Sequence, residues 1–208
     1  MSVPTWRYED AAILEGCRVV AGVDEVGRGS LAGPVVAAAV VLDRRRPVRG
    51  VNDSKLLTPA RRRDLARRIV ERSMAVGLGV APSEEVDRLN VLQATLAAMR
   101  RAIEALGVRP DCLLLDAVRL REVDARQVSL VHGDRLSMSI AAASIVAKVV
   151  RDDAMEHYAE AFPAFDFAAN KGYGTRGHLE ALERLGPCPI HRRTFHGVWI
   201  ERPLAFEG

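Results

Sequence analysis

Short apolar runs alternate along the chain with segments whose apolar residues recur at helical spacing. The first two runs, residues 18–24 and 34–42, are separated by a glycine-containing turn and predict a hairpin of two strands. Shorter runs at residues 75–80, 113–115 and 128–131 predict three more strands. Strands that alternate with helices after an initial hairpin are typical of an α/β fold, with a mixed β-sheet flanked by helices.

Two segments in the first half of the chain predict amphipathic helices. The first begins after Thr58, a cap residue followed by proline, and its buried stripe is expected to consist of Leu65, Ile69 and Val70. The second is expected to start with Ser83 as its cap and to stop at Gly107. Its apolar residues at helical spacing are Leu92, Leu96, Met99, Ile103 and Leu106.

The last third of the chain predicts two further helices. A long one is expected to begin at Ser137 or Ser139 and to end near Ala161. Beyond it the sequence becomes rich in Gly, Pro, His and Arg, with a short helix around residues 177–185. We therefore expect an α/β domain and a C-terminal helical extension packed on it, residues 1–161 and 162–208.

The composition is that of a globular protein and excludes several other classes. Of the 208 residues, 49% are hydrophobic and 27% are charged, which rules out wholesale disorder. The richest apolar stretch, residues 31–42, has 12 residues, whereas a membrane span needs about 20. The first residues lack the apolar core of a signal peptide. We expect a protein that is neither exported nor bound to a membrane.

Cysteine content and charge bear on the cellular compartment and on the kind of partner that we expect. The three cysteines are widely spaced and form no C-x-x-C motif, so we expect buried thiols in a reducing compartment and a cytoplasmic protein. Thirty basic residues against 27 acidic ones give a net charge of +3, too small a bias to indicate nucleic acid by itself. Lysine is rare, which makes each of the three lysines a candidate for a specific role: Lys55, Lys148 and Lys171.

Carboxylates stand where three predicted elements begin or end. Asp24 ends the first strand beside Glu25, Asp116 ends the strand at residues 112–115, and Asp134 lies just before the long helix. Because strand ends meet at one edge of an α/β sheet, these acids are candidates for a single cleft. Carboxylates in one cleft repel one another, and a pair of divalent cations relieves that repulsion. Each acid alone is more often a turn or cap residue, and that alternative stays open.

The end of the first strand raises two further questions. Asp24 and Glu25 are adjacent, so their side chains point to opposite faces unless the strand bends or ends there, which Gly27 allows. The glycines do not form a dinucleotide fingerprint, because the spacing is not G-x-G-x-x-G and a strand follows. Gly27, Arg28 and Gly29 form either a plain hairpin turn or a turn that lets a substrate backbone approach closely.

The sequence resembles the ribonuclease HII family in several motifs that follow the family's order over residues 18–196. The motifs are DEVGRG at 24–29, LAGPV at 31–35, NDSK at 52–55, LDA at 115–117, GD at 133–134, SIAAASIVAK at 139–148 with RD at 151–152, KGYGT at 171–175 and HRRTF at 191–195. Ser30 stands where the family commonly has proline, and Thr194 where it commonly has serine. The co-linear set is more specific than any single motif.

This resemblance implies a ribonuclease H-like catalytic domain that hydrolyses the RNA strand of RNA/DNA hybrids and cuts on the 5′ side of single ribonucleotides in duplex DNA. Asp24, Glu25, Asp116 and Asp134 would be the catalytic, metal-binding carboxylates. They would hold two divalent ions, Mg²⁺ or Mn²⁺, which activate a water and stabilise the leaving 3′ oxygen. The products would be a 3′-hydroxyl and a 5′-phosphate, and the protein would be a monomer.

The resemblance also implies which residues bind the substrate. Gly27, Arg28, Gly29 and Tyr173 would read the 2′-hydroxyl that distinguishes RNA from DNA. Without the resemblance, a tyrosine between two glycines is more simply an aromatic plug in a surface turn.

Four more residues are candidates for contacts with the nucleic acid: Lys55, Ser144, Lys148 and Lys171. Ser144, Lys148 and Arg151 share one face of the long helix, which could follow phosphates. Equally open is a solvated face on which Lys148 pairs with Asp152. Asp53 and Asp152 are expected to be structural, the first in a turn and the second as an ion-pair partner.

Two other functions stay open. A ribonuclease HIII-like nuclease would prefer longer RNA tracts and usually carries an extra N-terminal domain, for which the 17 residues before the first strand leave no room. A catalytically silent nucleic-acid-binding module on the same fold is the second, although the presence of all four acids argues against it.

Overall fold

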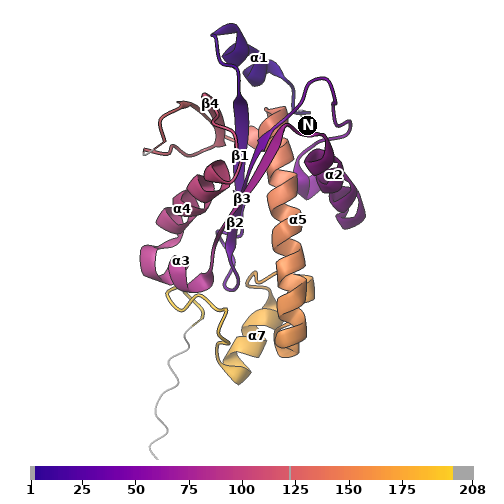
Figure 1. Cartoon of the computed structure of the whole chain (residues 1–208). Helices are drawn as coiled ribbons and strands as arrows, with labels where there is room; N and C mark the ends of the chain where they lie inside the picture. Colours follow the sequence, from indigo (N-terminus) through magenta and orange to yellow (C-terminus); the bar gives the residue numbers. More distant parts are fainter. Residues whose placement is uncertain (1–2, 122, 199–208) are drawn as a thin grey trace, which may run out of the picture.

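The computed structural model describes residues 3–121 and 123–198 and arranges them around a central β-sheet (Figure 1). The sheet has five strands in the order β3-β2-β1-β4-β5. β1 pairs antiparallel with β2 and β2 with β3, whereas the β1–β4 and β4–β5 pairs are parallel. The predicted hairpin and mixed sheet are confirmed. The strands are Val20–Val26 (β1), Val35–Val41 (β2), Ala75–Ala81 (β3), Cys112–Asp116 (β4) and Arg126–Leu130 (β5).

Helices cover both faces of the sheet. α2 and α5 pack on one face and α4 on the other, each over its own apolar core (Figure 1). The α-helices of the described residues are Arg7–Leu14 (α1), Pro59–Arg72 (α2), Ser83–Leu89 (α3), Val91–Glu104 (α4), Met138–Ala161 (α5), Phe167–Asn170 (α6) and Arg176–Leu185 (α7). Three short 3-10 turns are Ser54–Leu56 (η1), Gly133–Arg135 (η2) and Pro163–Phe165 (η3). Among these helices, none has the length and apolar character that crossing a membrane requires.

Small residues let the helices lie close to the sheet. Every residue of β2 is buried. All of them are valine or alanine, so only short side chains project from either face of the strand. Gly22 on β1 faces the start of α5, where a Cβ would lie 2.1 Å from the carbonyl carbon of Ser139. A larger residue at Gly22 would therefore push α5 away from the strand that carries Asp24.

The helix predictions need three corrections. Val70 is 55% exposed and Leu92 is 45% exposed, because each lies beside the buried stripe of its helix and not on it. The single helix expected after Ser83 is two helices. Asn90 interrupts it with a φ of +67°, and its side chain then caps the second helix by accepting a hydrogen bond from the backbone N–H of Gln93. Ser83 is the first residue of α3 and not its cap.

Helix α1 has no counterpart in the sequence-based prediction. It is only eight residues long and no side chain caps its N-terminus, so the local signals are weak. Ala12 is buried in a small cluster with residues of β1, β4 and α5, which shows that tertiary packing holds the helix in place.

The C-terminal segment packs on the far end of α5 and on the loop after β1. Its core contains residues of η3, α6 and α7 together with Leu31, Ala32 and Met155. His178 and His191 are buried there, with their Nε2 atoms 2.9 Å apart. Burial, followed by the charge of His178, lowers the pKa of His191 to about 4. α7 confirms the short helix predicted near residue 180, whereas the boundary between two domains at residue 161 stays a prediction.

Candidate active site

Two of the predicted carboxylates lie where the pairing of two parallel strands stops. Asp116 is the last residue of β4, whereas Asp24, which was predicted to end its strand, lies two residues before the end of β1. β1 and β4 pair in register up to Val23 and Leu115. Asp24 and Asp116 are the next residue of each strand, so they lie side by side at the carboxyl edge of the sheet. The expectation that strand ends bring these acids together is met by this register.

Asp24 is buried between the sheet and α5. Its carboxylate accepts a hydrogen bond from the backbone N–H of Glu25 at 2.8 Å and another from Ser144 on α5. Burial raises its pKa well above the usual range, and the charges of Glu25 and Asp116 raise it further, whereas the hydrogen bond from Ser144 acts against them. Asp24 is therefore an ionisable group held where its charge is costly.

Glu25 points to the opposite side of β1 but still belongs to the same group of charges. Its Oε1 accepts a hydrogen bond from the guanidinium of Arg28 at 3.2 Å. Its Oε2 is buried and has no hydrogen-bond partner among the described residues. Burial raises the pKa of Glu25 and the charge of Asp116 adds to this, while Arg28 opposes both. An oxygen left without a donor is available to a ligand.

Asp134 reaches this edge on the η2 turn, which is tied directly to Asp116. The backbone N–H of Gly133 donates to Oδ1 of Asp116 at 2.8 Å. Asp134 is buried, and this raises its pKa, as do the charges of Asp53 and then Asp116. Lys55 and Arg135 act in the other direction. The turn therefore couples the last two acids both through the backbone and through their charges.

Asp53 and Arg135 form the support behind Asp134. Asp53 caps the η1 turn by accepting from the backbone N–H of Lys55 at 2.9 Å, and it pairs with Nε of Arg135 at 3.0 Å. The structural role predicted for Asp53 is confirmed. The part played by Arg135 was not predicted, because its partner lies 82 residues away in the sequence.

The four acids suit hard divalent cations. Asp24 and Asp134 are buried, Glu25 and Asp116 are half-buried, the acids repel one another, and Oε2 of Glu25 has no hydrogen-bond partner among the described residues. Within residues 3–121 and 123–198, no three His, Cys, Asp or Glu side chains already converge as a set of metal ligands. The reason is visible in the contacts, because Glu25 turns towards Arg28 and Asp116 towards the N–H of Gly133.

The two predicted recognition elements lie next to each other. The carbonyl of Gly172 accepts hydrogen bonds from the backbone N–H groups of Leu31 and Ala32, at 2.8 and 3.2 Å. This joins the turn at residues 27–29 to the segment of Tyr173, whose side chain is 38% exposed. A Cβ on Gly29 would meet no atom within 4 Å, so the backbone there is open to an approaching molecule.

Two buried arginines hold these elements together, a role that was not predicted. Arg151 donates to the carbonyls of Pro34, Ala32 and Lys171 and to the hydroxyl of Ser30. Arg192 donates to the carbonyls of Gly33 and Arg28.

The suggestion that Arg151 shares a phosphate-following face with Ser144 and Lys148 is wrong. The C-terminal segment and the residue 30–34 loop cover Arg151, which is fully buried and cannot reach a phosphate. Its guanidinium lies 5.5 Å from the centre of the Tyr173 ring. Ser30, where the family commonly has proline, is one of its partners at 2.7 Å.

The remaining candidate residues lie in different surroundings. Lys148 pairs with Asp152 at 2.5 Å, as one of the two alternatives predicted, but the face is not solvated as that alternative had it, because Ser144 and Asp152 are buried. Burial lowers the pKa of Lys148. Lys171 donates to Glu156 at 2.8 Å. Ser144 is buried and hydrogen-bonds to Ser54 as well as to Asp24. Lys55 is exposed beside Asp134.

This mixed five-stranded sheet flanked by helices, with neighbouring carboxylates on two parallel strands, has the architecture of the ribonuclease H-like class. A solved structure of ribonuclease H2 from Pyrococcus horikoshii OT3 is similar to the chain, with a TM-score of 0.75 and 28% identity over 87% of this chain and 95% of that one. The sequence model of the ribonuclease HII family matches residues 21–198, and the chain belongs to this family.

Known relatives agree with this membership. Ribonuclease HII of Geobacter sulfurreducens is 52% identical over 193 residues, which make up 93% of this chain and 89% of that protein. The Enterococcus faecalis enzyme is 51% identical over 189 residues, 91% of this chain and 74% of that protein. The chain is therefore a ribonuclease H, an endonuclease that acts on nucleic acid, and the predicted family, fold and enzyme class are confirmed.

Proposed function

We propose that the chain hydrolyses the RNA strand of RNA/DNA hybrids and cuts on the 5′ side of single ribonucleotides in duplex DNA. Asp24, Glu25, Asp116 and Asp134 would hold two divalent cations, Mg²⁺ or Mn²⁺. One observation carries this assignment: β1 and β4 pair in parallel up to Val23 and Leu115, so Asp24 and Asp116 are neighbours, and Asp116 accepts from the N–H of Gly133, the residue before Asp134. In keeping with this geometry, the charge of Asp116 raises the pKa of each of the other three acids. Carboxylates that act on one another in this way form one group, and Arg28, Lys55 and Arg135 offset their repulsion only in part, since the pKa values stay raised.

Each residue has a part that follows from its surroundings. When bound, two such ions would supply an activated water and charge stabilisation for the leaving 3′ oxygen, and the products would be a 3′-hydroxyl and a 5′-phosphate. Asp24, fixed by Ser144 and by the N–H of Glu25, offers an anionic oxygen from β1. Glu25 offers its unpartnered Oε2. Asp116 at the end of β4 and Asp134 on the η2 turn approach from the β4 side, joined by the hydrogen bond from Gly133 to Asp116.

The histidines of the C-terminal core are not suited to act as the base. His178 and His191 are buried against each other and against Phe165 and Phe167. The pKa of both is lowered by burial. Proton removal from the attacking water therefore has to rely on the carboxylate group and what it binds.

Recognition of the ribonucleotide is proposed for the turn at residues 27–29 and for Tyr173. The open backbone at Gly29 permits close contact with a sugar, and the ring of Tyr173 stands at the surface on the buried Arg151. The 2′-hydroxyl is the group that distinguishes RNA from DNA there. Lys55, Lys148 and Lys171 would add contacts with the backbone phosphates. We further propose that the protein acts as a monomer in the cytoplasm.

The test is cleavage of three labelled duplexes: one holding a single ribonucleotide, one holding a long RNA tract, and one of DNA alone. With Mg²⁺ or Mn²⁺ we expect cuts on the 5′ side of the single ribonucleotide, and none with EDTA. Cleavage restricted to the long RNA tract would instead indicate the ribonuclease HIII-like alternative. Binding of all duplexes without any cleavage would indicate the silent module and would contradict the proposal.

A further inference from the structure

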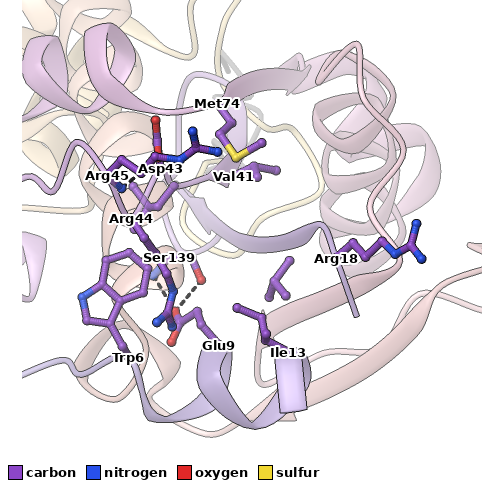
Figure 2. A pocket seen from close by; sticks show the side chains of 12 residues that line it. Trp6, Glu9, Ile13, Arg18, Val41, Asp43, Arg44, Arg45, Met74 and Ser139 are labelled. Atoms are coloured by element: carbon purple, nitrogen blue, oxygen red, sulfur yellow. Dashed lines mark hydrogen bonds between the residues drawn. The ribbon is translucent and has the colours of Figure 1, made fainter. Parts of the chain in front are cut away.

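A buried carboxylate near the N-terminus lies against the first turn of α5. Glu9 on α1 is 2% exposed. Its Oε1 accepts hydrogen bonds from the backbone N–H of Ser139 at 2.8 Å, from the Ser139 hydroxyl at 2.6 Å and from the Ser137 hydroxyl at 2.6 Å. Figure 2 shows the bonds between Glu9 and Ser139, close to Trp6 and Arg44. Three donors on one oxygen make this a specific attachment.

The main chain reinforces the same attachment. The backbone N–H of Thr5 donates to the carbonyl of Leu136 at 3.1 Å, and the N–H of Met138 donates back to Thr5 at 3.2 Å. Thr5 and Ser137 thereby form an isolated β-bridge. We call these contacts of Thr5 and Glu9 with residues 136–139 the N-terminal clasp. It joins two segments about 130 residues apart, as the Glu9–Ser139 contact measures.

The clasped residues continue directly into the turn that carries Asp134. The backbone N–H groups of Leu136 and Ser137 both donate to the carbonyl of Gly133, at 3.0 and 2.9 Å. The N–H of Gly133 in turn donates to Asp116. A shift of the first turn of α5 would therefore be passed to both carboxylates.

The turn has little conformational freedom of its own with which to absorb such a shift. His132, just before it, has a φ of +57°, which a residue with a side chain rarely adopts. A Cβ on Gly133 would lie 2.6 Å from the side chain of Ile140, so the turn is packed tightly against α5. The turn and the start of α5 are thus expected to move as one body.

Capping of the helix does not by itself account for Glu9. Ser137 already caps α5 by accepting from the backbone N–H of Ile140 at 3.2 Å. Glu9 adds a negative charge at the positive end of the helix, but its Oε2 is buried with no partner among the described residues. An unpartnered buried oxygen destabilises the folded protein, so a gain in stability does not by itself explain why Glu9 is placed here.

We propose that Glu9 is a positioning residue for the catalytic carboxylates. Through Ser137 and Ser139 it fixes the start of α5, and with it the Gly133–Arg135 turn that bears Asp134 and donates to Asp116. The inference rests on the proposed function, because it gives those carboxylates their metal-holding role. Catalytic groups need placement to within about 0.5 Å, which a clasp on an adjacent helix turn can supply.

The experiment compares Glu9→Ala and Glu9→Gln with a matched control, Asp10→Ala. Asp10 is the next residue of the same helix, but its partner is the exposed Arg44. Affinity for Mn²⁺ is measured by calorimetry without substrate, and kcat and KM are measured on a single-ribonucleotide duplex. For Glu9→Ala we expect about a 10- to 100-fold weaker Mn²⁺ affinity and a similar loss of kcat, with KM unchanged. Glu9→Gln keeps an acceptor oxygen and should recover most of the loss, and Asp10→Ala should match the wild type.

A second variant keeps the inference testable if Glu9→Ala does not fold. Ser137→Ala combined with Ser139→Ala removes two of the three donors to Glu9 and leaves the backbone N–H, so we expect a smaller loss of Mn²⁺ affinity. A folded clasp variant that is less heat-stable but keeps the wild-type Mn²⁺ affinity and kcat would overturn the inference. Failure of the wild type to bind Mn²⁺ or to cleave would instead count against the proposed function.

Discussion

The carboxylate group and the loop beside it differ in how their buried charges are compensated. At the sheet edge, Asp24, Glu25 and Asp134 are buried among like charges, and their pKa values are raised. In the loop, Arg151 and Arg192 are buried among carbonyl oxygens that accept hydrogen bonds from their N–H groups. In the first region Arg28, Lys55 and Arg135 offset the repulsion between the acids only in part, whereas in the second region carbonyl oxygens surround each guanidinium. The carboxylate group is therefore suited to bind cations, whereas the two arginines stabilise the loop beside it.

The largest expected effect comes from removing one charge from the carboxylate group. Asp24→Asn keeps the size of the side chain but offers a weaker ligand, so cleavage should fall by at least about 10³-fold while duplex binding persists. Single-turnover cleavage and a binding assay in Ca²⁺ or EDTA measure the two quantities. Asp43→Asn, a change at a half-buried position outside this group, is the control. Retained cleavage in Asp24→Asn would separate this residue from the reaction.

The second largest effect is expected in the scaffold, and it concerns stability. Arg192→Met removes hydrogen bonds to the carbonyls of Gly33 and Arg28 and leaves those buried acceptors unpaired. The free energy of unfolding should fall by about 2–4 kcal/mol.

Urea denaturation measures this loss, with Arg176→Met as control. Arg176 has 93% of its side chain exposed and, among the residues that the structure describes, forms an ion pair only with Glu180 one turn away. Its loss should therefore change stability by less than about 0.5 kcal/mol. Equal effects of the two substitutions would show that the buried arginine does not hold the loop.

A smaller effect is expected for the aromatic ring that stands on this scaffold. Tyr173→Ala should lower kcat/KM on a single-ribonucleotide duplex by about 10-fold, because the ring would no longer contact the sugar at the junction. The loss on a long RNA/DNA hybrid should be smaller, since other contacts and other cleavage positions remain. Tyr173→Phe separates the contribution of the ring from that of the hydroxyl. An equal loss on both substrates would contradict a role in reading the junction.

The smallest effect is a pH dependence of stability in the absence of metal. The folded-state pKa values of Asp24, Glu25 and Asp134 are raised, chiefly by burial, so the folded state binds more protons than the unfolded state above about pH 4. The stability they contribute is complete below their unfolded pKa values, and it is lost as the pH rises through the folded ones.

Urea denaturation in EDTA from pH 4 to 8 should therefore show a decline that Asp24→Asn reduces and Mg²⁺ offsets. A decline that is the same in wild type and Asp24→Asn would mean that this acid is not under repulsion in the folded protein.

The positions of two of the acids could be predicted, because they lie towards the carboxyl ends of two strands that pair in parallel. Apolar runs locate β1 and β4, and parallel neighbours bring Asp24 and Asp116 to one edge. Helical spacing gave the face shared by Ser144 and Arg151, but it carries no information on what covers that face. The structure shows that the C-terminal segment covers Arg151, which is therefore part of the scaffold.

Contacts between distant segments could not be predicted from local patterns. Arg135 pairs with Asp53, and Glu9 reaches Ser139 from a helix too short to be recognised. Such contacts depend on how complete elements pack and not on propensity or periodicity. Arg192 lay within a recognised motif, but only the buried carbonyls around it reveal what it does.

The most direct test of the central claim is calorimetric titration of Mn²⁺ into the wild type and into Asp116→Asn. Asp116 is the acid whose charge acts on the other three, so it should be needed for the group to take up its ions. We expect two ions per chain for the wild type, and for the variant the loss of at least one of them. Unchanged stoichiometry and affinity in Asp116→Asn would contradict the claim that the four carboxylates act together.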